Sequence, residues 1–266
     1  MLVSHNHRFI FLKTKKTAGT SIELYFEPFC MSPELPGRKL PGAQVSEYGI
    51  VGSRGKQHGG SRDWRAHMSA RQIRDKIGDE TWHGYLRFAT IRNPYDRTVS
   101  AYFFKKHRRG EPITDPARER DAFKVWLESE GPPMDRNKFM IEGEYCLTDV
   151  IRYESMLSDL ERICMRVGVP FEPGRLPQAK SGIRPPWATV NAMYSDSARV
   201  IVAELLALNS RCSGMRFRMT GRRIGSRDLF LFRNQEIRKH TGVRVDARPA
   251  GGNWPRTGAA TRYADR

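Results

Sequence analysis

Short apolar runs alternate with amphipathic segments along the chain. The runs at 9–12, 85–91 and 148–153 contain mostly β-favouring residues, and each predicts a buried strand. Helical spacing of apolar residues predicts helices near 21–26, 69–78, 94–104, 122–127, 153–168 and 196–208. Strands that alternate with helices predict an α/β fold with a mostly parallel central sheet and helices on both faces, in three layers.

Capping residues mark where several of these helices begin and end. Ser69 is suited to cap the helix at 69–78, and Gly78 is suited to end it. Asn93 can cap the next helix, with Pro94 at its first position. Gly168 closes the helix at 153–168, which carries the clearest apolar face in the chain.

Two regions lack a sustained period. Residues 27–65 are rich in proline, glycine and serine, which predicts a long irregular excursion after the first helix. Beyond Gly221 the chain is rich in arginine and glycine and has few apolar residues. We therefore expect one domain over 1–217 and a basic, poorly ordered tail over 218–266.

Length and composition favour a globular protein. The chain has 266 residues, of which 39% are hydrophobic, enough for one α/β domain with a core. It contains no apolar stretch of membrane-spanning length and no apolar signal segment before the first strand, so we expect a soluble, cytoplasmic protein. The four cysteines are scattered without metal-ligand spacing, which is typical of free thiols in a reducing compartment.

The charge is strongly positive and unevenly distributed. The formal net charge is +17, which favours anionic partners. Residues 216–266 contain 13 lysines and arginines against 4 acidic residues, so this segment carries about half of the excess. The remainder of the chain is only mildly basic.

A basic, hydroxyl-rich loop follows the first predicted strand. Small residues in the loop allow the backbone to turn tightly and approach a ligand, lysines supply charge, and hydroxyls supply donors. A strand, such a loop and a helix N-terminus together form an anion site, because backbone N–H groups and the helix dipole point to the same place. The loop lacks the G-x-x-x-x-G-K-[ST] pattern of nucleoside triphosphatases, since its lysine precedes the glycine. By itself, a lysine-rich turn of this kind is more often only a solvated loop.

The order of residues 16–21, Lys-Thr-Ala-Gly-Thr-Ser, resembles the 5′-phosphosulfate-binding loop of sulfotransferases. These enzymes use the donor 3′-phosphoadenosine-5′-phosphosulfate (PAPS). The resemblance implies a P-loop-NTPase-like three-layer architecture. It also implies donor-binding residues here, which are Lys13, Lys16, Thr17, Ala18, Gly19, Thr20 and Ser21.

A second element resembles the 3′-phosphate-binding site of the same family. Arg92 ends the second predicted strand, and Ser100 lies eight residues later on the following helix. A guanidinium can bind two phosphate oxygens, and a hydroxyl on the helix can donate a further bond. The alternative for Arg92 is a surface ion pair with Asp96. Because the Lys16 loop and Arg92 both follow carboxyl ends of strands, we expect them to face one pocket.

Looser similarities continue along residues 7–205. Tyr153 and Glu154 open a helix that resembles a third block of the family. Lys180, Ser181 and Arg184 resemble its late donor-contacting loop, so Lys180 and Arg184 are also candidate donor ligands. The segment after the last helix is a poor version of the family's aromatic-rich ending.

The resemblance implies sulfuryl transfer from PAPS to an acceptor hydroxyl, or less favourably an amine. Lys16 is placed to neutralise charge on the leaving bridging oxygen, and Lys13 either assists or is only solvated. His67 precedes a helix where histidine-base members of the family carry their base. His58, His83 and His107 are weaker candidates for the base. Glu23 and Glu154 are carboxylate alternatives.

Two other functions stay open. The phosphate cradle could serve a nucleotide-dependent phosphotransferase, although a magnesium enzyme would place an Asp where the second strand ends in Arg92. The basic tail could bind nucleic acid, but its charges are not interleaved with aromatic residues in a recognisable module. For the sulfotransferase reading no metal and no specific nucleic acid are expected. The acceptor would be a glycan or a small molecule.

Overall fold

The computed structural model describes residues 1–34, 42–54, 63–179, 181–211, 217–219 and 222–224. The chain divides into two compact units, Met1–Ser226 and Arg227–Arg266, and the second lies outside the described residues. The described residues near the predicted end of the domain form a two-stranded antiparallel pair, β9 (Phe217–Met219) and β10 (Arg222–Ile224). The domain boundary and the order of the tail therefore stay predictions.

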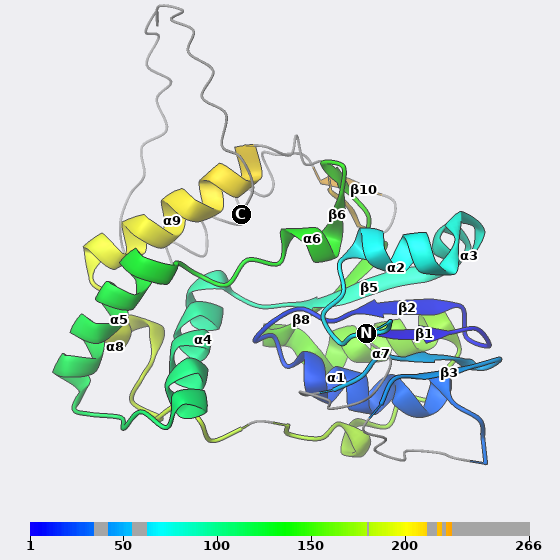
Figure 1. Ribbon diagram of the computed structural model, residues 1–266, viewed down its shortest axis with the longest axis horizontal. Coiled ribbons are helices and arrows are strands. Elements are labelled where there is room, and N and C mark those ends of the chain that lie inside the picture. The colour runs from blue at the N-terminus through cyan, green and yellow to red at the C-terminus, as the bar shows by residue number, and fades with distance from the viewer. Residues whose placement is uncertain (35–41, 55–62, 180, 212–216, 220–221, 225–266) are drawn as a thin grey trace, which may run out of the picture. The chain divides into compact units, whose positions relative to one another are not determined.

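A six-stranded sheet forms the centre of the first unit (Figure 1). The strands lie in the order β3 (Gln44–Ser46), β4 (Gly49–Val51), β1 (Leu2–Ser4), β2 (Phe9–Leu12), β5 (Leu86–Ile91) and β8 (Asp149–Arg152). The pairs β2–β5 and β5–β8 are parallel. The pairs β3–β4, β4–β1 and β1–β2 are antiparallel.

The fold is therefore mixed α/β, and the expectation of a mostly parallel sheet is wrong. The three strands predicted from apolar runs are the parallel ones, and the chain adds three short antiparallel strands beside them. Strand β1 precedes the first predicted strand and folds back on it as a hairpin. Strands β3 and β4 lie in the segment expected to be irregular. Three-residue strands carry too little periodicity to stand out in a sequence.

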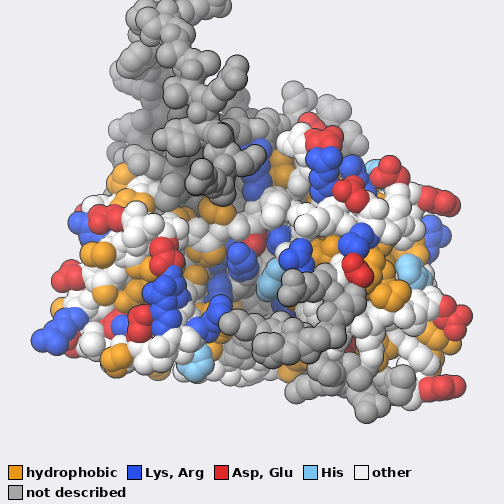
Figure 2. All heavy atoms as spheres, in the orientation of Figure 1, with side chains coloured by type: hydrophobic (Ala, Val, Ile, Leu, Met, Phe, Trp, Pro, Cys, Tyr) orange, Lys and Arg blue, Asp and Glu red, His pale blue; other side chains and the backbone are white. Residues whose placement is uncertain are grey.

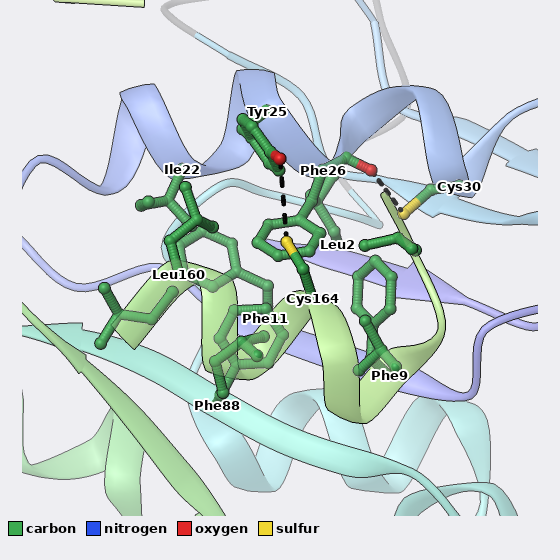
Figure 3. Close-up of a cluster of buried hydrophobic side chains, with 14 of the residues drawn as sticks. Leu2, Phe9, Phe11, Ile22, Tyr25, Phe26, Cys30, Phe88, Leu160 and Cys164 are labelled. Atoms are coloured by element: carbon green, nitrogen blue, oxygen red, sulfur yellow. Dashed lines mark hydrogen bonds between the residues drawn. The ribbon is translucent and has the colours of Figure 1, made fainter. Parts of the chain in front are cut away.

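Helices cover both faces of the sheet, as predicted. Helices α1 (Gly19–Phe26) and α7 (Met156–Val167) cover one face, while α2 (Ala70–Ile77) and α3 (Asp79–Gly84) cover the other (Figure 1). Strand alternation divides the core between these faces. Phe9 and Phe11 pack with Phe26, Phe88 and Leu160 on the α1 side (Figure 3). The intervening residues of β2 pack with α2 on the opposite side.

A separate helical group packs around its own apolar cluster. It comprises α4 (Pro94–Arg109), α5 (Pro116–Glu130), α8 (Val190–Met193) and α9 (Asp196–Arg211). Asn93 caps α4 by accepting bonds from two amides of its first turn, and Asp115 caps α5 in the same way. Because α4 begins directly after β5, this group stands next to the carboxyl end of the parallel strands.

Shorter elements complete the described chain. Helix α6 (Arg136–Phe139) leads into the hairpin of β6 (Met140–Ile141) and β7 (Glu144–Tyr145). Single 3₁₀ turns follow α1 at Glu27–Cys30, precede α7 at Tyr153–Ser155, and lie at Pro173–Arg175. Ser69 and Gln72 form a reciprocal capping box on α2, and Gly78 ends that helix, as expected from the sequence.

Candidate active site at the carboxyl edge of the parallel strands

A cleft of about 1310 Å³ lies where the three parallel strands end. The first residues after β2, β5 and β8 are Lys13, Arg92 and Tyr153, and all three line it. Figure 2 shows lysine and arginine side chains gathered over the region of α4 and toward the sheet on the face shown. The prediction that the Lys16 loop and Arg92 open onto one pocket agrees with this lining.

The loop between β2 and α1 makes two left-handed turns at residues other than glycine. Lys16 has φ of 61° and Ala18 has φ of 59°. A left-handed conformation at such residues costs free energy and persists only where the surroundings enforce it. Ala18 has no polar side chain to cap α1. The amides of Ser21 and Ile22 donate to the carbonyl oxygen of Ala18, so the amides that precede them at the start of the helix are the ones suited to an anion in the cleft.

Buried hydroxyls support this loop from beneath. Thr17 Oγ1 lies 2.7 Å from Thr14 Oγ1 and 2.7 Å from Thr90 Oγ1. Thr14 also donates to the backbone carbonyl of Thr90 in β5 at 2.6 Å. Gly19 completes the close packing, because a Cβ there would lie 3.1 Å from Lys13 Cγ. The loop is thereby fixed to the neighbouring parallel strand.

Arg92 contacts the loop and is itself held on both sides. Its Nη1 donates to the carbonyl oxygen of Lys16 at 3.2 Å, and its Nε donates to Asp96 Oδ2 at 2.6 Å. The guanidinium carbon lies 3.9 Å from the ring centroid of Tyr153. The ion pair with Asp96, considered above as an alternative role, is thus present while Arg92 still lines the cleft. It orients the guanidinium rather than removing it from the site.

Asp96 is shared by two arginines. Burial by itself would raise the pKa of this carboxyl, but bonds from Arg184 and Arg92 outweigh burial and lower it. Arg184 also donates to the backbone of Ala188. Its predicted role as a donor ligand is not supported by its position, since its side chain binds Asp96 and is not among the residues lining the cleft.

Helices α4 and α5 form the far wall of the cleft. Ser100 lines it from α4, as predicted, and Lys16 Nζ lies 3.8 Å from the ring centroid of Phe104 one turn later. Lys105 and Trp126 lie further along the same wall. Sequence reasoning missed this aromatic and basic wall, because its residues come from two helices and form no local motif.

His67 lines the cleft just before α2. Its Nδ1 lies 3.0 Å from the carbonyl oxygen of Lys13, and a carbonyl can only accept, so Nδ1 carries the proton. Partial burial lowers the pKa of the imidazole to about 4. The bond to the Lys13 carbonyl opposes this change, and the positive charges of Lys13, the Met1 amino group and Lys138 add to it. The ring is thus neutral at physiological pH, and its Nε2 is left able to accept a proton.

Lys13 is engaged by a buried carboxylate. Its Nζ pairs with Glu23, which also accepts from Arg54 at 2.8 Å and from the amino group of Met1 at 2.9 Å. Burial would raise the pKa of Glu23, but the Met1 amino group and Lys13 outweigh it and lower the pKa to about 2. Glu23 is therefore a partner for cations, and the carboxylate-base alternative does not fit its surroundings. Lys13 lines the cleft while bound to it.

The other predicted site residues are placed as follows. Ala18, Gly19, Thr20 and Ser21 line the cleft, whereas the buried Thr17 hydroxyl supports the loop and does not line it. Lys180 and His58 lie outside the described residues. Glu154 accepts from the amide of Asn93 at 2.6 Å and has a structural role. His83 and His107 are not among the residues lining the cleft.

Within the part of the chain that the structure describes, no three His, Cys, Asp or Glu side chains cluster in a way that could hold a metal ion. The described helices include none with the length and apolar character needed to cross a bilayer.

A strand–loop–helix cradle with two converging cations is typical of anion sites in α/β proteins. Comparison with known families gives the class: the model of the sulfotransferase family matches residues 1–184, and the chain belongs to that family. The match includes the Lys16 loop, Arg92, Ser100 and His67, and it ends at Arg184. No curated protein and no solved structure matches the chain.

Proposed function

We propose that this protein transfers the sulfuryl group of PAPS to an acceptor hydroxyl. Membership of the sulfotransferase family supports sulfotransfer in general, and the cleft supports this donor. The 5′-phosphosulfate would lie against the loop 16–21 and the first turn of α1. The 3′-phosphate would lie against Arg92 and Ser100.

The single observation that carries the proposal is the convergence of Lys16 and Arg92. They are 76 residues apart, yet Arg92 bonds the backbone of Lys16 and both side chains line one cleft. A donor with phosphate groups at two ends of one adenosine needs two separated cations in a fixed relationship. A single phosphate site would not require this arrangement.

The transfer itself is an in-line displacement. The acceptor oxygen forms a bond to sulfur while the bond from sulfur to the bridging oxygen of the donor breaks. The acceptor proton passes to Nε2 of His67, and the electron pair of the broken bond stays on the 5′-phosphate of the leaving nucleotide. Lys16 would neutralise the charge that grows on the bridging oxygen, with Thr20 and backbone amides as further donors.

The acceptor is proposed only by class. His67 requires an acceptor that loses a proton, and a hydroxyl on a glycan or a small molecule fits this chemistry. The far wall around Trp126 and Lys105 offers room beyond the donor site.

The proposal is tested by incubating the protein with ³⁵S-labelled PAPS and a panel of hydroxyl-bearing glycans and small molecules. Transfer of label with release of 3′-phosphoadenosine-5′-phosphate (PAP) is expected. A parallel arm with ATP, magnesium and the same acceptors tests the phosphotransferase alternative. Label transfer from ATP together with no affinity for PAP would overturn the proposal.

A further inference from the structure

A buried ion pair next to the cleft binds the backbone of Lys15, the residue before Lys16. The carboxylate belongs to Asp135, whose side chain is 1% exposed, and its partner is Arg97 on α4. Asp135 Oδ2 accepts a bond from the amide of Lys15 at 2.6 Å. Arg97 Nε donates to the carbonyl oxygen of Lys15 at 2.8 Å. The backbone amide and the backbone carbonyl of Lys15 are thus bound by the two members of one ion pair.

The same short segment also holds His67. The amide of Lys138 donates to the carbonyl oxygen of Asp135 at 2.7 Å, and its side-chain Nζ donates to the carbonyl oxygen of His67 at 2.7 Å. His67 in turn bonds the carbonyl of Lys13 through Nδ1. A closed set of contacts therefore links Asp135, Lys138, His67 and the loop.

We propose that Asp135, Arg97 and Lys138 are positioning residues that fix the distance between Lys16 and His67. This inference rests on the proposed function, because it assigns the two groups their roles there. The contacts of Asp135 and Arg97 hold Lys15, so Lys16 is presented in its left-handed conformation. Lys138 holds the backbone of His67 on the same frame.

The burial of the Asp135–Arg97 pair argues against a purely stabilising role. Asp135 Oδ1 is buried without a hydrogen-bond partner among the described residues. Burial raises the pKa of Asp135, and Arg97 opposes that change. Apolar residues can often replace a buried ion pair without loss of stability. The presence of this pair is therefore better explained by its bonds to the backbone of the loop.

The test uses the full-length protein with four variants and one control. Arg97→Lys keeps the positive charge against Asp135 but lacks the Nε–H that bonds Lys15. Asp135→Ala removes the acceptor of the bond from the Lys15 amide, and Asp135→Asn keeps an oxygen that can accept that bond. Lys138→Met removes the bond to the carbonyl oxygen of His67, together with the Lys138 charge that acts on Asp135. Asp149→Asn is the matched control, because Asp149 is also buried and paired with arginines, but its bonds go to Arg162 and Arg166 on α7 rather than to Lys15.

We expect Arg97→Lys and Asp135→Ala to lower kcat by about 10- to 100-fold, as small misplacements of catalytic groups do. Asp135→Asn should recover part of that loss. Lys138→Met should lower kcat and leave the affinity for PAP nearly unchanged, because Lys138 bonds the backbone of His67 and is not among the residues lining the cleft. Decreases in kcat no larger than that of Asp149→Asn at equal melting temperature would overturn the inference.

A measurement without turnover separates this inference from the proposed function. Hydrogen exchange of the Lys15 amide should become faster in Asp135→Ala and stay unchanged in Asp149→Asn. If Asp135→Ala fails to fold, Arg97→Lys and Asp135→Asn carry the kinetic test. A wild-type protein that neither binds PAP nor transfers label would contradict the proposed function, while unchanged exchange at Lys15 would contradict the positioning role.

Discussion

Arg92 donates through Nη1 to the carbonyl oxygen of Lys16 at 3.2 Å, so the two cations of the cleft belong to one rigid arrangement. The strand that precedes each of them explains why. β2 and β5 are parallel neighbours, and their carboxyl ends meet at one edge of the sheet. The convergence of Lys16 and Arg92 is therefore a consequence of strand pairing, and the proposed donor site depends on it.

His67→Gln should abolish turnover and spare nucleotide binding. Glutamine can still donate to the carbonyl of Lys13, but at neutral pH it cannot take up the proton of the acceptor hydroxyl. Loss of a general base lowers rates by about 10²- to 10⁴-fold. Label transfer and PAP calorimetry on the same preparation measure the two effects. A lost base should lower turnover by about 10²-fold or more. If the turnover of His67→Gln stayed within about 2-fold of wild type, His67 would be rejected as the base.

Activity should persist well below neutral pH. The base acts in its neutral form, and the pKa of His67 is lowered to about 4. Thus kcat/KM should stay level from neutral pH down to about 5, below the ordinary histidine value of about 6.5, and fall as pH approaches 4. Between pH 6.5 and pH 4, His67 is protonated in the unfolded chain but neutral in the folded protein. The free energy of unfolding therefore declines as pH falls through this range. An acid limb centred at 6.5 or above would contradict the assignment.

Glu23→Gln should destabilise the fold. The wild-type carboxylate is fully buried and forms ion pairs with Lys13, Arg54 and the Met1 amino group. Removing one member of a buried ion pair costs about 3–5 kcal/mol, and urea unfolding at pH 7 should show a loss of that size. Glu128→Gln, at a largely exposed site, is the control.

The same carboxylate gives a pH dependence. Because the pKa of Glu23 is lowered to about 2, its contribution is complete above the unfolded value of about 4.5 and declines as pH falls toward 2. Wild type should therefore lose its stability advantage over Glu23→Gln across that interval. A difference that stays constant from pH 5 to pH 2 would show that Glu23 is not charged in the fold.

Tyr153→Leu should weaken PAP binding by about 2- to 5-fold. The ring lies 3.9 Å from the guanidinium carbon of Arg92, and a partly exposed cation–π contact is worth about 0.5–1 kcal/mol. Tyr153→Phe keeps the ring and serves as the matched control, with affinity close to wild type. Calorimetry that finds the two variants equal would show that stacking does not orient Arg92.

Local patterns were sufficient to predict the parallel half of the fold and that the Lys16 loop and Arg92 face one cleft. Strand β2 was predicted with its observed bounds, because four consecutive apolar residues flanked by polar ones leave little choice. The start of α4 was predicted from Asn93 and Pro94, which act through local hydrogen bonds. Arg92 and the Lys16 loop were predicted because each follows such a strand directly.

Long-range contacts explain what the sequence could not reveal. Asp135 meets Lys15 across 120 positions, and nothing around Asp135 marks it as a partner of the loop. The antiparallel strands β1, β3 and β4 depend on pairing with one another rather than on their own periodicity. Arg184 follows a family-like loop in sequence, yet tertiary packing directs it to Asp96.

The most direct test is calorimetry with PAP on wild type, Lys16→Ala, Arg92→Ala and the control Arg118→Ala. Arg118 is exposed on α5 and is not among the residues lining the cleft, so its variant removes the same charge without touching the site. Each lost phosphate contact should weaken binding by about 10-fold or more, since bonds between charged groups contribute about 1.5–3 kcal/mol. The account predicts losses for Lys16→Ala and Arg92→Ala and none for Arg118→Ala. Equal affinity in all four proteins would contradict it.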